Sequence, residues 1–85
     1  MNQAIIFTDR EEWDPIRHGV VCMAQVNGFQ VYCCVAAQTL NDRYGTAAEP
    51  EQYIALFRQH RWDLDDELEQ AILDEAFEDD GWVVI

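Results

Sequence analysis

The chain has 85 residues and a net charge of −12, from 17 acidic residues against five arginines and no lysine. Its length fits one domain over residues 1–85, and its 49% hydrophobic content excludes a disordered chain. A surface of this charge repels phosphate groups and anionic lipids, so we expect no direct contact with nucleic acid or membranes. No apolar run approaches the ~20 residues of a membrane span. We see no signal peptide, and three cysteines favour a reduced, cytoplasmic protein.

The first predicted element is a short strand over residues 4–8, which form an apolar run. A charged connection over residues 9–15 follows it. Pro15 disfavours a helix at Asp14. We expect Trp13 in this connection to fold back over an edge of the core.

The strongest pattern is a β-hairpin over residues 19–36. Two apolar, β-branched runs flank the pair Asn27-Gly28. Both central residues of a tight hairpin turn need positive φ, which Asn and Gly tolerate best. The two-residue turn then pairs Cys22 with Cys33.

This register divides the hairpin into two faces, because side chains alternate along a strand. One face is entirely apolar and is predicted to form the floor of the core: Val20, Cys22, Ala24, Val26, Phe29, Val31, Cys33 and Val35. The other face is mixed, as a partly wet or partner-covered surface would be: Val21, Met23, Gln25, Gln30, Tyr32 and Cys34.

The spacing after the hairpin becomes helical. It predicts a short helix over residues 37–44 that ends before Gly45 and begins without a capping side chain. A second helix begins at Pro50. We expect it to end near Trp62, with Asp63 capping a third helix; the alternative is one long helix over residues 50–78.

The last helix is predicted to bury Leu64, Leu68, Ile72 or Leu73, Ala76 and Phe77. A turn at residues 80–81 then leads to a final strand over residues 82–85. The resulting fold class is α+β, in the order β-β-β-α-α-α-β. An antiparallel sheet of the N-terminal strand, the central hairpin and the C-terminal strand carries two to three helices on one face.

Scattered residues also match a known family pattern: Ile5-Ile6-Phe7-Thr8, Trp13-Asp14, Gly28, Cys33, Leu40, Phe57, Arg61, Asp63 and Gly81. Through them the chain resembles, over nearly its whole length, the small bacterial proteins grouped as domain of unknown function 1488. Ala36 stands where that family often has glycine or a small polar residue. The resemblance implies a compact α+β domain of the bacterial cytoplasm and brings no activity, cofactor or catalytic residue.

The cysteines and histidines are the candidates for chemistry. Cys22 and Cys33 form a cross-strand pair about 5.5 Å apart at Cα, within disulfide range, but we interpret both as reduced core residues. Cys34 faces the other side and is the better candidate for a reactive thiol, with His18 as a possible partner. The cysteines, His18 and His60 are not spaced along the chain as metal ligands usually are, so we expect no metal or cofactor.

The acidic residues are concentrated at the end of the chain, where residues 63–85 hold ten carboxylates and no base. Such a run is typically a solvated helix face. Carboxylates near a helix C-terminus are unfavourable, however, which favours a docking role for Glu75, Glu78, Asp79 and Asp80. Arg61 is expected to pair with a neighbouring carboxylate, and Trp62 to cover an edge of the core.

These observations favour a non-enzymatic protein-interaction module. Its candidate interface is Val21, Met23, Tyr32 and Cys34, and its partner is a basic protein or a second copy. Two alternatives remain: a thiol-based redox protein or small enzyme that uses Cys34 and His18, and an acidic nucleic-acid mimic that binds a basic protein.

Overall fold

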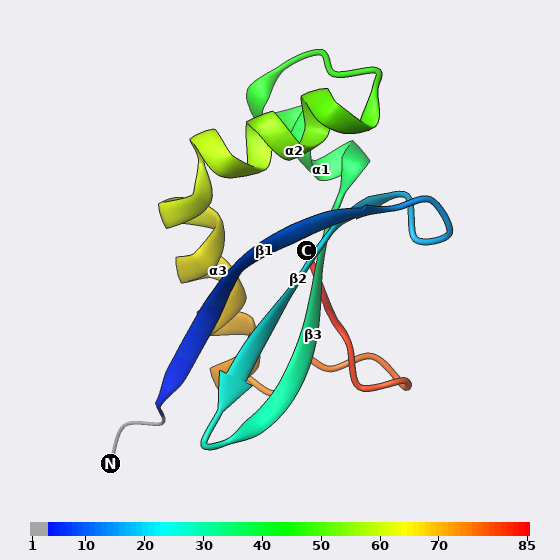
Figure 1. Ribbon diagram of the computed structural model, residues 1–85. Coiled ribbons are helices and arrows are strands. Elements are labelled where there is room, and N and C mark those ends of the chain that lie inside the picture. Colours follow the sequence, from blue (N-terminus) through cyan, green and yellow to red (C-terminus); the bar gives the residue numbers. More distant parts are fainter. Residues whose placement is uncertain (1–3) are drawn as a thin grey trace.

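The computed structural model describes residues 4–85 and confirms the predicted α+β class and element order. Four strands form one mixed sheet in the order β1-β2-β3-β4, and three helices connect β3 to β4 (Figure 1). The elements are β1 (Ile5–Asp14), β2 (Gly19–Val26), β3 (Phe29–Ala36), α1 (Ala37–Tyr44), α2 (Pro50–Gln59), α3 (Arg61–Leu73) and β4 (Val83–Val84).

The hairpin of β2 and β3 has the predicted turn and register. Asn27 and Gly28 both have positive φ, 52° and 87°, as this turn requires. Cys22 pairs with Cys33, and Met23 pairs with Tyr32. The two faces of the hairpin are therefore assigned as predicted.

Strand β1 is longer than predicted, because the charged stretch after Thr8 continues the strand to Asp14. A bulge between Phe7 and Glu11 shifts its register against β2. Arg61 donates to the Thr8 carbonyl and to the Glu11 carboxylate, 2.9 Å away. Contacts from α3 thus stabilise the irregular part of the strand. These contacts join residues distant in sequence, so the local sequence could not predict them.

The last strand pairs with β3 in parallel, so the prediction of an antiparallel sheet was wrong for β4. A parallel neighbour requires a long crossover connection, and here α1, α2 and α3 together form it. The strand is also shorter than the predicted residues 82–85, and Trp82 precedes it.

The helices begin and end close to the predicted positions. Helix α1 covers residues 37–44 and has no side-chain cap, as expected. The break between α2 and α3 exists but lies at His60, so Asp63 falls within the first turn of α3 and does not cap it. A capping interaction was missed: the Gln52 side chain accepts from the backbone N–H groups of Ala48 and Glu49 at 2.8 and 3.0 Å.

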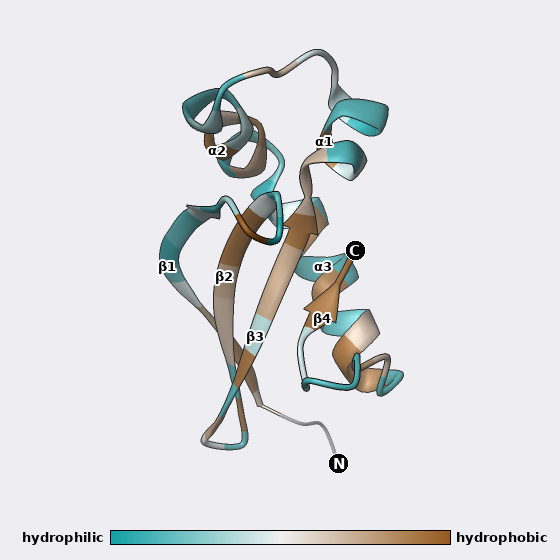
Figure 2. Cartoon of the chain, turned by 90° about the vertical axis from the view of Figure 1, so that its right-hand side faces the viewer, coloured by the Kyte–Doolittle hydropathy of each residue, from teal (hydrophilic) through white to brown (hydrophobic). Residues whose placement is uncertain are grey.

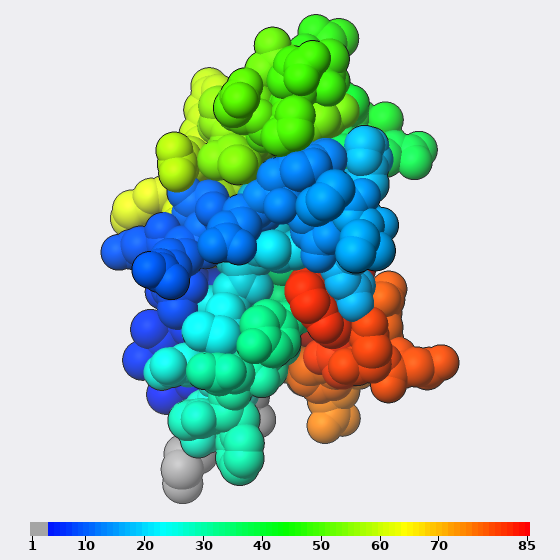
Figure 3. Space-filling view, turned by 45° about the vertical axis from the view of Figure 1, so that its right-hand side comes forward, coloured from blue at the N-terminus to red at the C-terminus, as the bar shows by residue number. Residues whose placement is uncertain are grey.

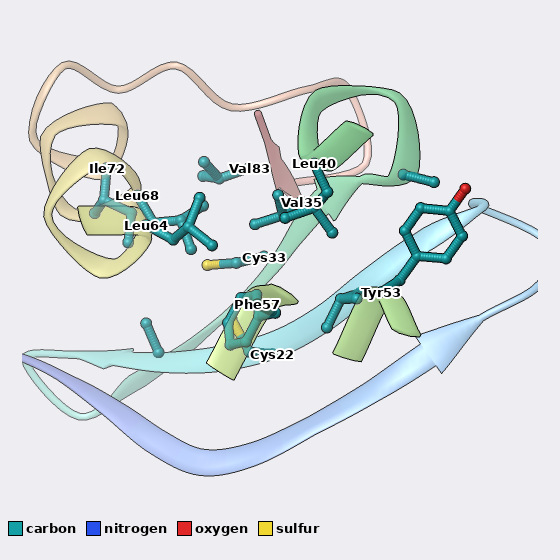
Figure 4. Packing of buried hydrophobic residues seen from close by; sticks show 13 residues of the cluster. Cys22, Cys33, Val35, Leu40, Tyr53, Phe57, Leu64, Leu68, Ile72 and Val83 are labelled. Atoms are coloured by element: carbon teal, nitrogen blue, oxygen red, sulfur yellow. The ribbon is translucent and has the colours of Figure 1, made fainter. Parts of the chain in front are cut away.

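The core lies between the inner face of the hairpin and the three helices (Figure 4). Phe57 and Leu64 are fully buried there. Phe29 is 76% exposed, because it lies at the hairpin tip, and its prediction as a core residue was wrong. Val20, Cys22, Ala24, Cys33 and Val35 are buried as predicted, and Val26 and Val31 pack against them in part.

Helix α3 ends at Leu73, earlier than its hydrophobic pattern suggested. Ile72 is buried, whereas Leu73 is 47% exposed, which settles the choice between them. Ala76 and Phe77 lie beyond the helix and are exposed, so their predicted burial was wrong. None of the helices in residues 4–85 is long and apolar enough to cross a membrane.

Candidate functional site

One face of the sheet is turned away from the helices, and we call it the outer sheet face. It is formed by alternate side chains of β1, β2 and β3, beside the C-terminal segment (Figure 3). Strands β2 and β3 are mostly hydrophobic, whereas the neighbouring part of β1 is hydrophilic (Figure 2). The candidate interface residues Val21, Met23 and Tyr32 lie on this face, as the register predicts.

A shallow hollow of about 210 Å³ lies in the outer sheet face. Its surface is almost entirely apolar, with charged side chains from β1 at the rim. Tyr32 is 47% exposed, and Val21 and Met23 are half-buried. The lining residues are Thr8, Arg10, Glu12, Val21, Cys22, Met23 and Tyr32.

A stack of side chains closes one end of the outer sheet face. The Tyr32 and Trp82 rings are stacked with centroids 5.2 Å apart, and the Arg17 guanidinium lies 3.7 Å from the Trp82 ring centre. Arg17 also pairs with Asp80, and Glu78 lies 3.9 Å from it. The turn before β2 and the segment before β4 are thereby joined across this face.

Cys34 is buried under this end of the face, with 1% of its surface exposed. Its prediction as an interface residue was therefore wrong. Its sulfur packs so closely on Gly19 that a Cβ there would lie 2.7 Å from it. Burial raises the pKa of the Cys34 thiol to about 11, against the opposing effect of Arg17, so the reactive thiolate is scarce at neutral pH.

The other thiols and His18 do not combine with Cys34. The His18 ring packs edge-on against Trp13, 5.1 Å between centroids, and Trp13 packs against the core on the helix-covered face. Cys22 and Cys33 are free thiols in that core. The hydrogen bond between them, together with burial, raises the pKa of Cys22, and the same bond lowers the pKa of Cys33.

The four carboxylates predicted as a docking face are not equivalent. All four are exposed, but only Glu78 and Asp80 interact with an arginine among residues 4–85, namely Arg17. The backbone N–H of Trp82, with Arg17, lowers the pKa of Asp80. The single positive charge of Arg17 therefore offsets about one of the four negative charges.

A second charged site joins the bulge of β1 to the start of α3. The Glu11 side chain is 4% exposed and accepts from both Arg58 and Arg61. Arg61 also pairs with Asp65, which confirms its expected carboxylate partner. Burial raises the pKa of Asp65, and within residues 4–85 its Oδ1 atom has no hydrogen-bond donor. Trp62 beside them is 89% exposed and does not cover the core.

Two residues at the rim of the hollow, Arg10 and Glu12, were not predicted from the sequence. They fall in the predicted charged connection over residues 9–15 and so had no place on a sheet face. The alternate positions of Thr8, Arg10 and Glu12 could have indicated a continued strand. The apolar run that predicted the strand, however, ends at Thr8. Among the residues that the structure describes, no group of three or more His, Cys, Asp or Glu side chains is placed to hold a metal ion.

Comparison with known proteins gives consistent matches. Residues 5–85 match the family model described as "Protein of unknown function (DUF1488)". The "Uncharacterized protein YrdB" of Escherichia coli K12 is 49% identical over 98% of this chain and 96% of its own length, and that of Shigella flexneri is 48% identical over the same shares. The crystal structure of a DUF1488 family protein from Shewanella loihica PV-4 is 31% identical, with a TM-score of 0.93, and covers 100% of this chain and 94% of its own.

Proposed function

Since the chain belongs to the DUF1488 family of proteins of unknown function, we propose from its geometry that it is a non-enzymatic protein-interaction module that binds through the outer sheet face. The observation that carries the proposal is the apolar hollow in a sheet face without a helix. Half-buried Val21 and Met23 lie beside the exposed Tyr32 ring. An apolar centre with a polar rim is typical of protein interfaces.

The thiol alternative receives less support from the same geometry. Cys34 is buried, its pKa lies well above neutrality, and His18 packs on the other face. A nucleophilic thiol needs access and a depressed pKa, and Cys34 has neither. As part of the proposal the protein is cytoplasmic, which its three free thiols support.

A second candidate partner is a basic protein, bound by the helical side of the molecule. Arg17, Arg43, Arg58 and Arg61 are engaged in ion pairs with five of the 17 carboxylates. The other twelve have no arginine within ion-pair distance in the part of the chain that the structure describes. A protein that binds nucleic acid is one such partner, and DNA would then compete with this chain for it in a salt-dependent manner.

The proposal is tested by affinity capture with the tagged full chain and two variants of the outer sheet face. Met23→Asp places a charge in the hollow, and Ile6→Asp changes a side chain on the same face that is 62% exposed. Both should lose a protein that binds through the outer sheet face, and both should keep a basic protein that binds the helical side. Gln38→Asp on α1 is the matched control, because Gln38 is exposed on the helical side and the substitution adds the same charge as the two face variants. Circular dichroism verifies that each variant is folded.

Capture that is lost in both face variants and kept in the control supports the proposal. If both face variants are folded and retain every partner of the wild type, the outer sheet face is not the binding surface.

A further inference from the structure

We infer that the partner of the outer sheet face is a second copy of this chain, packed face to face about a twofold axis. The inference rests on the proposed function and deepens it. A twofold interface requires a surface that is complementary to itself. The outer sheet face meets this requirement in both its charges and its apolar side chains.

The rim of the hollow carries one charge of each sign. Arg10 and Glu12 both line the hollow and flank Glu11 on β1. Neither forms an ion pair with another residue among 4–85. The other four arginines all form such pairs. Both side chains are exposed, so each can pair with its opposite on another molecule.

One row of the sheet runs between the two charges: Glu12 follows it and is in register with Val21, and Arg10 precedes it, at the end of the β1 bulge. Glu11, Cys22 and Cys33 are register partners across β1, β2 and β3. A twofold axis that lies between two facing sheets and runs along this row sets each Arg10 opposite the Glu12 of the other copy. The same rotation sets each Met23 opposite the other Val21.

The apolar contacts agree with this arrangement. Sheets that pack face to face lie about 10 Å apart and interdigitate their side chains. Met23 stands beside the hollow, and its flexible thioether can enter the hollow of the opposite copy. Tyr32 supplies an exposed aromatic ring at the edge of the same contact.

The distribution of charge favours this face over any other for a second copy. Two chains of −12 repel each other, and the repulsion is smallest where their carboxylates stay far apart. Most unpaired carboxylates lie on the helices and directly after them, on the side turned away from the contact. Examples are Asp42, Glu51, Asp63, Asp66, Glu69 and Asp74.

The contact is small. Three strands of about eight residues cover only a few hundred Å² by strand spacing and rise, below the ~800 Å² per partner of a standard stable interface. We therefore expect a weak dimer, visible as a rise in mass from micromolar to millimolar concentration.

Charge reversal on the two rim residues tests the pairing. Arg10→Glu gives a rim with two negative charges, and Glu12→Arg gives a rim with two positive charges. Each variant alone should dimerise at least about tenfold more weakly than the wild type, because attraction becomes repulsion at two symmetric pairs. An equimolar mixture of the two variants should recover dimers, and so should the double variant R10E/E12R. Sedimentation equilibrium of the full chain measures all of these masses.

Asp42→Arg on α1 is the control for net charge, because it changes the charge as Glu12→Arg does but lies away from the outer sheet face. It should dimerise at least as well as the wild type. The inference is overturned if the wild type stays monomeric up to millimolar concentration. It is also overturned if the single variants dimerise like the wild type, or if mixing them restores nothing. A monomeric wild type whose capture of another protein still depends on Met23 would reject the second copy and leave the proposed function standing.

Discussion

At the scale of single residues, burial decides which side chains are available for chemistry. Cys34 lies on the face that alternation predicts to be partly wet or partner-covered, yet it is 1% exposed within the chain itself. Arg17, Trp82 and Tyr32 form the stack at that end of the face. Cys34 itself lies between β2 and β4, with its sulfur against Gly19. The parallel pairing with β4 joins residues 50 positions apart, so no local pattern could reveal this burial.

Alkylation kinetics test the protection of Cys34. In the folded protein it should react with iodoacetamide much more slowly than in urea, because the thiol is buried and its pKa is about 11. Peptide mapping by mass spectrometry distinguishes Cys34 from the other thiols. Equal rates in the folded and the unfolded chain would contradict the described burial.

Asp65 gives a second prediction, on the dependence of stability on pH. Burial raises the pKa of Asp65 above its ordinary value of 3.8, so the folded state binds the proton more tightly than the unfolded state. Relative to Asp65→Asn, the free energy of unfolding of the wild type should fall as pH rises from 3.8 through the raised pKa, and should then stay level. Urea titrations between pH 3 and 8 measure this difference; a difference that is independent of pH, or that grows in favour of the wild type, contradicts it.

At the scale of elements, local signals predicted some features and tertiary contacts decided others. The Asn27-Gly28 pair predicted the turn and the register, because the backbone needs of a two-residue turn are strictly local. The direction of β4 depends on where the crossover helices return the chain, which two apolar residues do not encode. The extension of β1 depends on Arg58 and Arg61, which hold Glu11 from the helices.

The end of α3 offers a matched pair of substitutions. Ile72 is 3% exposed and Leu73 is 47% exposed, although they are adjacent and similar in size. Ile72→Ala should lower the free energy of unfolding by about 2–5 kcal/mol, and Leu73→Ala by about 1 kcal/mol or less. Chemical denaturation measures both. Equal losses of stability in the two variants would contradict the assignment of Ile72, and not Leu73, to the buried face of α3.

At the scale of the whole molecule, the fold separates two surfaces of different character. The helical side carries most of the uncompensated negative charge. The outer sheet face carries an apolar hollow with one exposed charge of each sign at its rim. The sequence predicted Val21, Met23 and Tyr32 on that face from alternation alone. It could not place Arg10 and Glu12 there, because the extension of β1 that presents them is held by contacts distant in sequence.

In the proposed dimer, this separation would lower the repulsion between two strongly acidic chains. Contact through the outer sheet face keeps the helical carboxylates of two copies on opposite sides of the pair. Interaction with a basic protein would use the helical side, so the two modes of binding are compatible.

Dimerisation through the outer sheet face can be followed by light scattering, as the mass of the full chain in solution at increasing concentration. We expect the mass to rise from 9.9 kDa towards twice that value, Met23→Asp to remain at 9.9 kDa, and Asp42→Arg to behave like the wild type. A wild-type mass of 9.9 kDa at every concentration up to millimolar, or a Met23→Asp variant that associates like the wild type, would contradict it.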